Sequence, residues 1–168
     1  MDIITSYFNN QKLVPDKDSI LRFFIIFSRF EYALKRAGYF KSDKNNGVKP
    51  DWDRFASGLK EHFNYSVNKE LTCSIDYLKN KPPLRQILKN NEFGWEDTGD
   101  DQRQPLIIML ICYIKRVRNN LFHGGKFPLR PIEETARDCL LLNSSLTILN
   151  ECLRLSPIVR NYFLNTEE

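Results

Sequence analysis

Apolar residues recur at intervals of three and four along most of this chain, which is the spacing of one face of an α-helix. The clearest example is the segment 16–37, where one helix face collects Ile20, Phe23, Phe24, Phe27, Phe30, Ala33, Leu34 and Ala37. No segment shows the sustained alternation of apolar and polar residues that is typical of a half-buried strand. The sequence therefore predicts an all-α fold, a helical bundle of four to five main helices.

Helix start and stop residues divide the chain further. Pro15 and two acids open the first helix and Gly38 ends it, while Pro82 and Pro83 interrupt the middle of the chain. The expected helices cover about 16–37, 50–63, 67–79, 104–122 and 132–155. A polar loop over 41–49, a turn of helix over 84–89 and an acidic loop over 92–101 are expected between them. We expect one domain over 1–168, with a core at about 16–155 and a short helical tail over 157–165.

Several function classes are disfavoured by composition. The sequence contains no run of about 18 uncharged apolar residues and begins without a basic segment followed by an apolar block, so we expect a cytoplasmic protein without membrane contact. The four cysteines are Cys73, Cys112, Cys139 and Cys152, and no two are close enough for a C-x-x-C pair. With only two histidines in the chain, we expect buried cysteines and neither a metal nor a cofactor.

The charges are unevenly distributed. The segment 102–132 contains six basic residues and no acidic one, whereas the segment 92–101 contains five acids. A locally positive segment is compatible with binding a phosphate backbone. A solvated face whose charges are balanced by residues distant in sequence is the alternative.

The end of the helix at 104–122 carries the most distinctive polar residues. Asn119 and His123 are four residues apart and share one helix face, with Lys115 one turn earlier. Arg118 lies about 100° around the helix from Asn119, a separation that its long side chain spans. Because the apolar stripe points elsewhere, polar and apolar faces are separated.

These residue types suffice to cleave RNA through attack of the 2′-hydroxyl on its own phosphate. A histidine at a helix C-terminus, where the dipole favours its protonated form, can act as a general base or acid. The forked guanidinium of Arg118 suits phosphate oxygens. The amide of Asn119 can donate and accept hydrogen bonds, so it could orient the histidine or a substrate oxygen. The reaction needs both a base and an acid, but one chain offers only His123 here. A twofold homodimer would supply both.

The segment 118–123, Arg-Asn-Asn-Leu-Phe-His, resembles the R-x4–6-H motif of the HEPN superfamily. In that superfamily the residue after the arginine is typically polar, as Asn119 is here. The segment 30–35, Phe-Glu-Tyr-Ala-Leu-Lys, is similar to the F-E-x-x-L segments of many members. The fold-level resemblance covers about 19–155, and its specific part is barely ten residues long.

The resemblance implies a HEPN-like helical homodimer with the motif at a composite cleft. It implies metal-independent endoribonuclease activity in toxin–antitoxin, abortive-infection or related antiviral defence systems, with RNA as substrate and an antitoxin or defence protein as partner. Arg118 and His123 would be catalytic, and Asn119 would be the accessory polar residue. HEPN toxins paired with nucleotidyltransferase antitoxins carry H-x-Y, and the chain departs from that branch because position 125 is Gly125.

Other residues have two interpretations each. Lys115 and Lys126 are candidate phosphate contacts, and Lys126 is equally well interpreted as a solvated loop lysine. Glu31 is a candidate orienting partner of Arg118 or His123, or a surface residue paired with Lys35.

Two rival functions remain open. One is a non-catalytic module that binds RNA or a nucleotide in the same positive pocket. The other is a structural or antitoxin-like interaction bundle, against which the separate polar face of the motif helix argues. The phenylalanines of the segment 16–37 are assigned to the core or to a dimer interface, and His62 has no assigned role.

Overall fold

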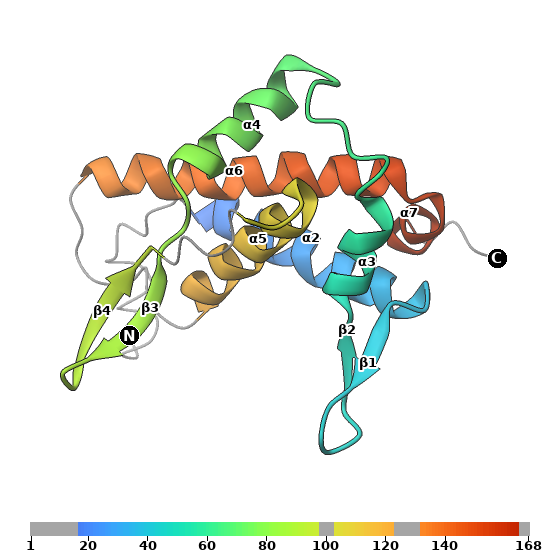
Figure 1. Cartoon of the computed structure of the whole chain (residues 1–168), viewed down its shortest axis with the longest axis horizontal. Coiled ribbons are helices and arrows are strands. Elements are labelled where there is room, and N and C mark those ends of the chain that lie inside the picture. Colours follow the sequence, from blue (N-terminus) through green and yellow to red (C-terminus); the bar gives the residue numbers. More distant parts are fainter. Residues whose placement is uncertain (1–16, 98–102, 123–131, 165–168) are drawn as a thin grey trace, which may run out of the picture.

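The computed structural model describes residues 17–97, 103–122 and 132–164, and most of these residues are helical (Figure 1). The described helices are α2 (Lys17–Arg36), α3 (Trp52–Leu59), α4 (Lys69–Asn80), α5 (Leu106–Phe122), α6 (Ile132–Leu155) and α7 (Pro157–Leu164). The expected helical class and the approximate positions of all these helices are confirmed. The second helix is shorter than expected, because it ends at Leu59 rather than near Phe63.

The helix ends follow from local chemistry. Gly38 takes a φ of 85°, and the chain closes α2 with bonds from Gly38 N to Lys35 O and from Tyr39 N to Leu34 O. This pair of bonds is a Schellman motif, which needs a left-handed residue that glycine adopts without steric cost. At the start of α4, the side chain of Asn68 accepts a hydrogen bond from Leu71 N at 2.8 Å. Such caps satisfy backbone groups that the helix itself leaves unpaired.

The expectation of a fold without strands is wrong. Strands β1 (Phe40–Ser42) and β2 (Val48–Pro50) form one antiparallel hairpin, and β3 (Arg85–Lys89) and β4 (Glu92–Glu96) form another. The first hairpin replaces the expected polar loop, and the second replaces the expected helical turn and part of the acidic loop. These strands are short and mostly exposed, so no buried face imposes an alternating pattern on their sequences.

Turn chemistry explains why both hairpins form. Asp43 Oδ1 accepts hydrogen bonds from Asn45 N and Gly47 N, at 2.9 and 2.8 Å, within the first turn. In the second turn, Asn90 and Asn91 have φ values of 52° and 64°. Two successive residues with positive φ are what a two-residue hairpin turn of the primed type requires, and asparagine tolerates this conformation well.

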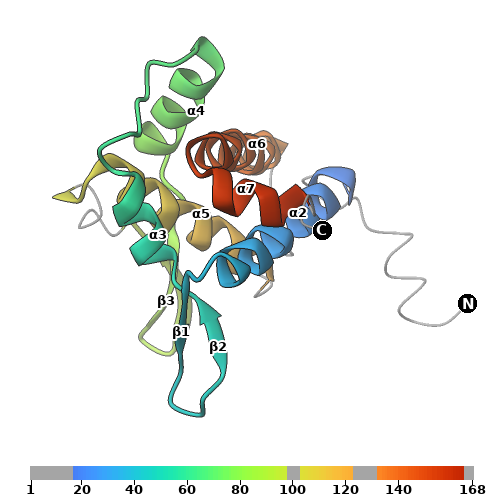
Figure 2. The same cartoon turned by 90° about the vertical axis from the view of Figure 1, so that its right-hand side faces the viewer.

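Helix α6 organises the packing. It runs the length of the molecule in Figure 1 and is seen nearly end on in Figure 2, and it contacts α2, α4, α5 and α7. In both views the two hairpins project from the same side of the helical body. None of the described helices is long and apolar enough to cross a membrane.

Aromatic residues fill the contact between α2, α3 and α7. Phe30 is fully buried and stacks on Trp52 with ring centroids 5.1 Å apart, while Phe55 and Phe163 meet its ring edge to face. The assignment of Phe23, Phe27 and Phe30 to the core is therefore confirmed. Phe24 is instead exposed, and its ring contacts that of Phe122.

The cysteines are less uniformly buried than expected. Cys152 is fully buried, and this burial raises the pKa of its thiol. Cys112 and Cys139 are half-buried, and Cys73 is exposed, so the expectation of burial is wrong for Cys73. Cys73 lies on the solvent side of α4. Its apolar neighbours in the sequence did not indicate which side of the helix this single residue would face.

Candidate active site

The last turn of helix α5 carries the part of the candidate motif from Arg118 to Phe122. The apolar stripe expected for this helix is buried at every position, namely Ile107, Leu110, Ile114, Val117 and Leu121. Met109, Ile111, Tyr113 and Asn120 are buried as well, whereas Asn119 is exposed. The expected separation of polar and apolar faces therefore holds for Asn119 but not for its neighbour Asn120, which is polar and buried.

Arg118 and Asn119 lie in direct contact. Arg118 Nη1 donates a hydrogen bond to Asn119 Oδ1 at 3.0 Å. The guanidinium also lies over the rings of Phe27 and Phe122, with its Cζ atom 5.6 and 5.4 Å from their centroids. These contacts restrict the orientation of the guanidinium, and a cation over an aromatic face is electrostatically favoured. No carboxylate in the described part of the chain forms a salt bridge with Arg118.

Lys115 lies one turn before Asn119, as expected, and is paired with a carboxylate. Its Nζ atom is 3.5 Å from Asp53 Oδ1, and Lys41 Nζ is 3.2 Å from Asp53 Oδ2. Burial acts to raise the pKa of Asp53, but the charge of Lys115 and the contacts with Lys41 outweigh it, so the pKa of Asp53 is lowered. Part of the charge of Lys115 is therefore compensated by α3.

Glu31 contacts Trp52, which was not among the partners expected for it. Its Oε1 atom accepts a hydrogen bond from Trp52 Nε1 at 3.4 Å. Within the described ranges it makes no hydrogen bond or salt bridge with Arg118 or with Lys35. The role of Glu31 as an orienting partner therefore gains no support from its contacts.

Three residues singled out from the sequence, in the motif or just after it, lie outside the described residues. These are His123, which directly follows Phe122 in the sequence, Gly125 and Lys126. The placement of the candidate catalytic histidine relative to Arg118 and Asn119 therefore stays a prediction from helical spacing.

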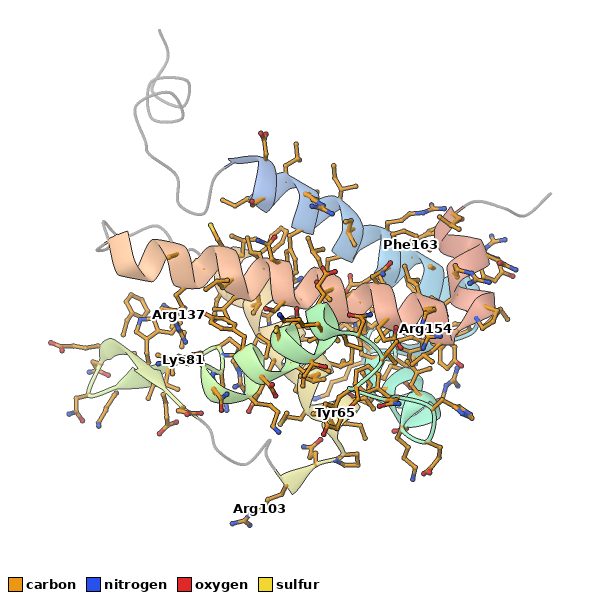
Figure 3. All side chains as sticks on the ribbon, turned by 90° about the horizontal axis from the view of Figure 1, so that it is seen from above. Tyr65, Lys81, Arg103, Arg137, Arg154 and Phe163 are labelled. Atoms are coloured by element: carbon orange, nitrogen blue, oxygen red, sulfur yellow. The ribbon has the colours of Figure 1, made fainter. Side chains whose placement is uncertain are left out.

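The segment 82–84, which leads into β3, is held by side chains of two helices. Its three consecutive carbonyl groups accept hydrogen bonds from Arg137 Nη2 to Pro82 O at 2.8 Å, from Arg116 Nη1 to Pro83 O at 3.2 Å, and from Asn120 Nδ2 to Leu84 O at 2.8 Å. Figure 3 shows Arg137 on the side of α6 that faces the end of α4, near Lys81. The second hairpin is therefore fastened to α5, the helix that carries the motif.

A groove of about 440 Å³ lies where β3 meets α5. Its seven described lining residues are Arg85, Gln86, Cys112, Lys115, Arg116, Asn119 and Asn120. Three of them are cations and none is a carboxylate. A groove of this charge, beside the Arg118–Asn119 pair, favours an anionic ligand such as a phosphate.

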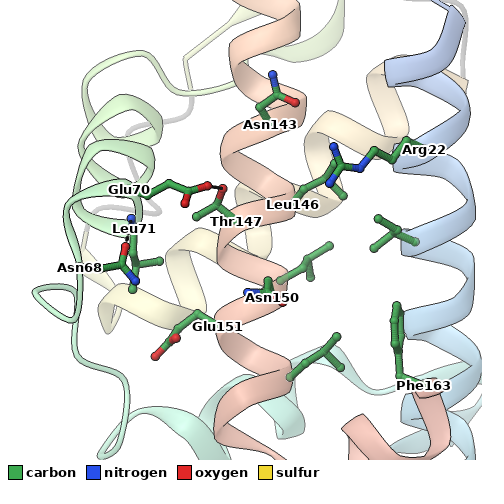
Figure 4. A pocket seen from close by; sticks show the side chains of 13 residues that line it. Arg22, Asn68, Glu70, Leu71, Asn143, Leu146, Thr147, Asn150, Glu151 and Phe163 are labelled. Carbon is green, nitrogen blue, oxygen red and sulfur yellow. Dashed lines mark hydrogen bonds between the residues drawn. The ribbon is translucent and has the colours of Figure 1, made fainter.

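A larger cavity of about 650 Å³ lies elsewhere, and its lining side chains stand on both sides of α6 (Figure 4). It contains one cation, Arg22, and two carboxylates, Glu70 and Glu151. Glu151 is paired with Arg154 at 2.6 Å, and Glu70 accepts a hydrogen bond from Thr147 at 3.2 Å. This cavity lacks the excess of positive charge that the groove beside α5 has, and no motif residue lines it.

Replacing Asn119 or Asn120 by alanine is expected to change the stability of the fold to very different extents. Asn120 is buried, so its loss leaves the Leu84 carbonyl unpaired and should lower the free energy of unfolding by about 1–3 kcal/mol. Asn119 is exposed, so its loss should change that free energy by less than about 0.5 kcal/mol. Urea denaturation followed by circular dichroism measures both. Equal destabilisation by the two variants would contradict the described hydrogen bonding.

No family model matches this sequence, and neither curated proteins nor solved structures include a match to it. The functional assignment therefore depends on the residues themselves and on the motif that they form.

Proposed function

We propose that this chain is a metal-independent endoribonuclease of the HEPN type, which cleaves RNA by transphosphorylation. The observation that carries the proposal is the Arg118–Asn119 pair beside a groove that contains three cations and no carboxylate. The mostly helical fold, with the motif near the end of a buried amphipathic helix and a long helix after it, is compatible with this assignment.

Each residue of the proposed site has a chemical role. Arg118 would stabilise the charge that develops on the phosphate oxygens in the transition state, because its planar fork matches them. Its hydrogen bond to Asn119 uses Nη1, and it makes no other hydrogen bond within the described ranges. Asn119 would act as a positioning residue for the guanidinium. Lys115 would contact a neighbouring phosphate.

His123 would complete the reaction. As general base it would accept the proton of the 2′-hydroxyl, whose oxygen then attacks the adjacent phosphorus. The new O2′–P bond forms as the P–O5′ bond breaks, and the departing O5′ takes a proton from a general acid. The products are a 2′,3′-cyclic phosphate and a 5′-hydroxyl. No step requires a metal or cofactor.

A homodimer would supply the general acid, because each chain has one histidine in the motif. An exposed apolar surface on the described part of α2 supports association, with Leu21, Phe24 and Ile25 all exposed and Phe122 beside Phe24. Exposed apolar patches of this kind are typical of interfaces.

The activity would suit a growth-restricting toxin or an antiviral effector controlled by an antitoxin or another defence protein.

Variants of Arg118 test the assignment. Arg118→Ala should lower the rate of RNA cleavage by about 100- to 1,000-fold, the usual loss when one donor to a developing oxyanion is removed. Arg118→Lys should recover only part of that loss, because lysine keeps the charge but not the fork. The measurement is the cleavage rate of a labelled RNA by each purified protein.

Arg103→Ala is the matched control, because it removes an exposed arginine that does not line the groove. It should cleave at the wild-type rate. Cleavage by Arg118→Ala at the wild-type rate would contradict the proposal. RNA binding without cleavage by the wild-type protein would instead indicate a non-catalytic RNA-binding module.

A further inference from the structure

The β3–β4 hairpin presents an uncharged face to solvent. In its register Leu88 is opposite Phe93, and Gln86 is opposite Trp95. Because strand side chains alternate between faces, these four residues share one face. Phe93 is 85% exposed, Leu88 is 70% exposed and Trp95 is 36% exposed. Such strong exposure of a phenylalanine has no benefit for folding, since it buries little apolar area.

The charged residues of the hairpin lie on its other face. Arg85 is opposite Glu96, and Lys89 is opposite Glu92, so residues of opposite charge face each other across the strands. Gly94 also belongs to this face, because a Cβ atom built on it would lie 3.6 Å from Ile87 Cγ1. The two faces therefore differ in kind, because one has charged residues of both signs and the other has uncharged residues that include the strongly exposed Phe93.

The aromatic face continues into the basic groove beside the motif. Gln86 belongs to that face and lines the groove together with Lys115 and Arg116, while Arg85 lines it from the charged face. The position of the hairpin relative to α5 is fixed by the hydrogen bonds to the carbonyl groups of segment 82–84. A chain lying along the hairpin would thus meet aromatic rings first, then cations, and then the Arg118–Asn119 pair.

We propose that the β3–β4 hairpin binds a single-stranded segment of the RNA substrate, with a base stacked on Phe93 and phosphates held in the groove. This inference rests on the proposed ribonuclease function. Stacking on aromatic side chains next to a positive groove is the general way in which proteins hold single-stranded nucleic acid. In a duplex the base faces are covered by their neighbours, so the hairpin selects unpaired RNA over paired RNA.

Binding of an uncleavable RNA tests this assignment. The probe is a short mixed-sequence 2′-O-methyl RNA with a fluorescein label, used as a single strand and as a duplex, and the readout is fluorescence anisotropy. Phe93→Ala should weaken binding of the single strand by about 5- to 100-fold and should leave duplex binding unchanged. Phe93→Trp should keep the wild-type affinity, because it keeps an aromatic face.

Tyr65→Ala is the matched control, since Tyr65 is an exposed aromatic residue in the connection between α3 and α4. It should bind as the wild type does. The inference is overturned if the wild type does not bind the single strand, or if Phe93→Ala binds it equally well. An unchanged RNA affinity with an altered molar mass in solution would assign the hairpin to a protein interface instead.

The probe also separates this inference from the ribonuclease proposal, because an RNA without a free 2′-hydroxyl reports binding alone. A wild-type protein that cleaves unmodified RNA, but whose binding does not depend on Phe93, overturns only the role of the hairpin. Phe93-dependent binding without cleavage of unmodified RNA overturns only the proposed nuclease.

Discussion

His123→Ala is expected to lower the rate of RNA cleavage by about 100- to 10,000-fold, which is the usual contribution of a general base or acid. The variant should still bind RNA, because the groove residues Arg85, Lys115 and Arg116 are unchanged. The measurement is the single-turnover cleavage rate of a labelled RNA, together with the affinity for its 2′-O-methyl analogue.

The chain provides a matched control for this variant. His62 is the other histidine of the sequence and is exposed after the end of α3. His62→Ala should therefore cleave at the wild-type rate. If both histidine variants cleave equally fast, the assignment of His123 is wrong, and a different base must be sought.

Phe30→Ala is expected to lower the free energy of unfolding by about 3–5 kcal/mol, the range for removing a buried phenylalanine side chain. Phe30 is fully buried, and its ring contacts Trp52, Phe55 and Phe163. The substitution therefore leaves a cavity where α2, α3 and α7 meet. Urea denaturation should show a lower midpoint with an unchanged slope.

Phe40→Ala is the control for Phe30, because Phe40 is half exposed on β1. It should change the free energy of unfolding by less than about 0.5 kcal/mol. A loss below about 1 kcal/mol for Phe30→Ala would show that the aromatic cluster does not form the centre of the core.

The helices were predictable because the residues that indicate them, the apolar stripe and the glycines and prolines at the helix ends, are close together in the sequence. The apolar stripe of α5, Ile107 to Leu121, recurs at helical spacing, and all its members are buried. The hairpins were not predictable from alternation, because β3 and β4 bury neither face. The turn between β3 and β4 did carry a signal, because the pair Asn90–Asn91 tolerates the positive φ values that such a turn needs.

The site was predictable only where its residues are neighbours on one helix. The contact between Arg118 and Asn119 follows from their positions on α5. The anchoring of segment 82–84 by Asn120 and Arg137 joins side chains to backbone carbonyls far away in the sequence, and no pattern within either segment encodes it. The contribution of Arg85 to the basic groove was missed for the same reason, because Arg85 reaches it from a hairpin that was not expected.

The central claim is tested most directly by the ends that the protein leaves on RNA in the presence of a chelating agent. The purified wild-type chain is incubated with a labelled RNA and excess EDTA, and the product termini are identified by mass spectrometry. Transphosphorylation predicts 2′,3′-cyclic phosphate and 5′-hydroxyl ends, with no cleavage of the 2′-O-methyl analogue. Cleavage that is lost with EDTA, or that leaves 5′-phosphate ends, would contradict the claim.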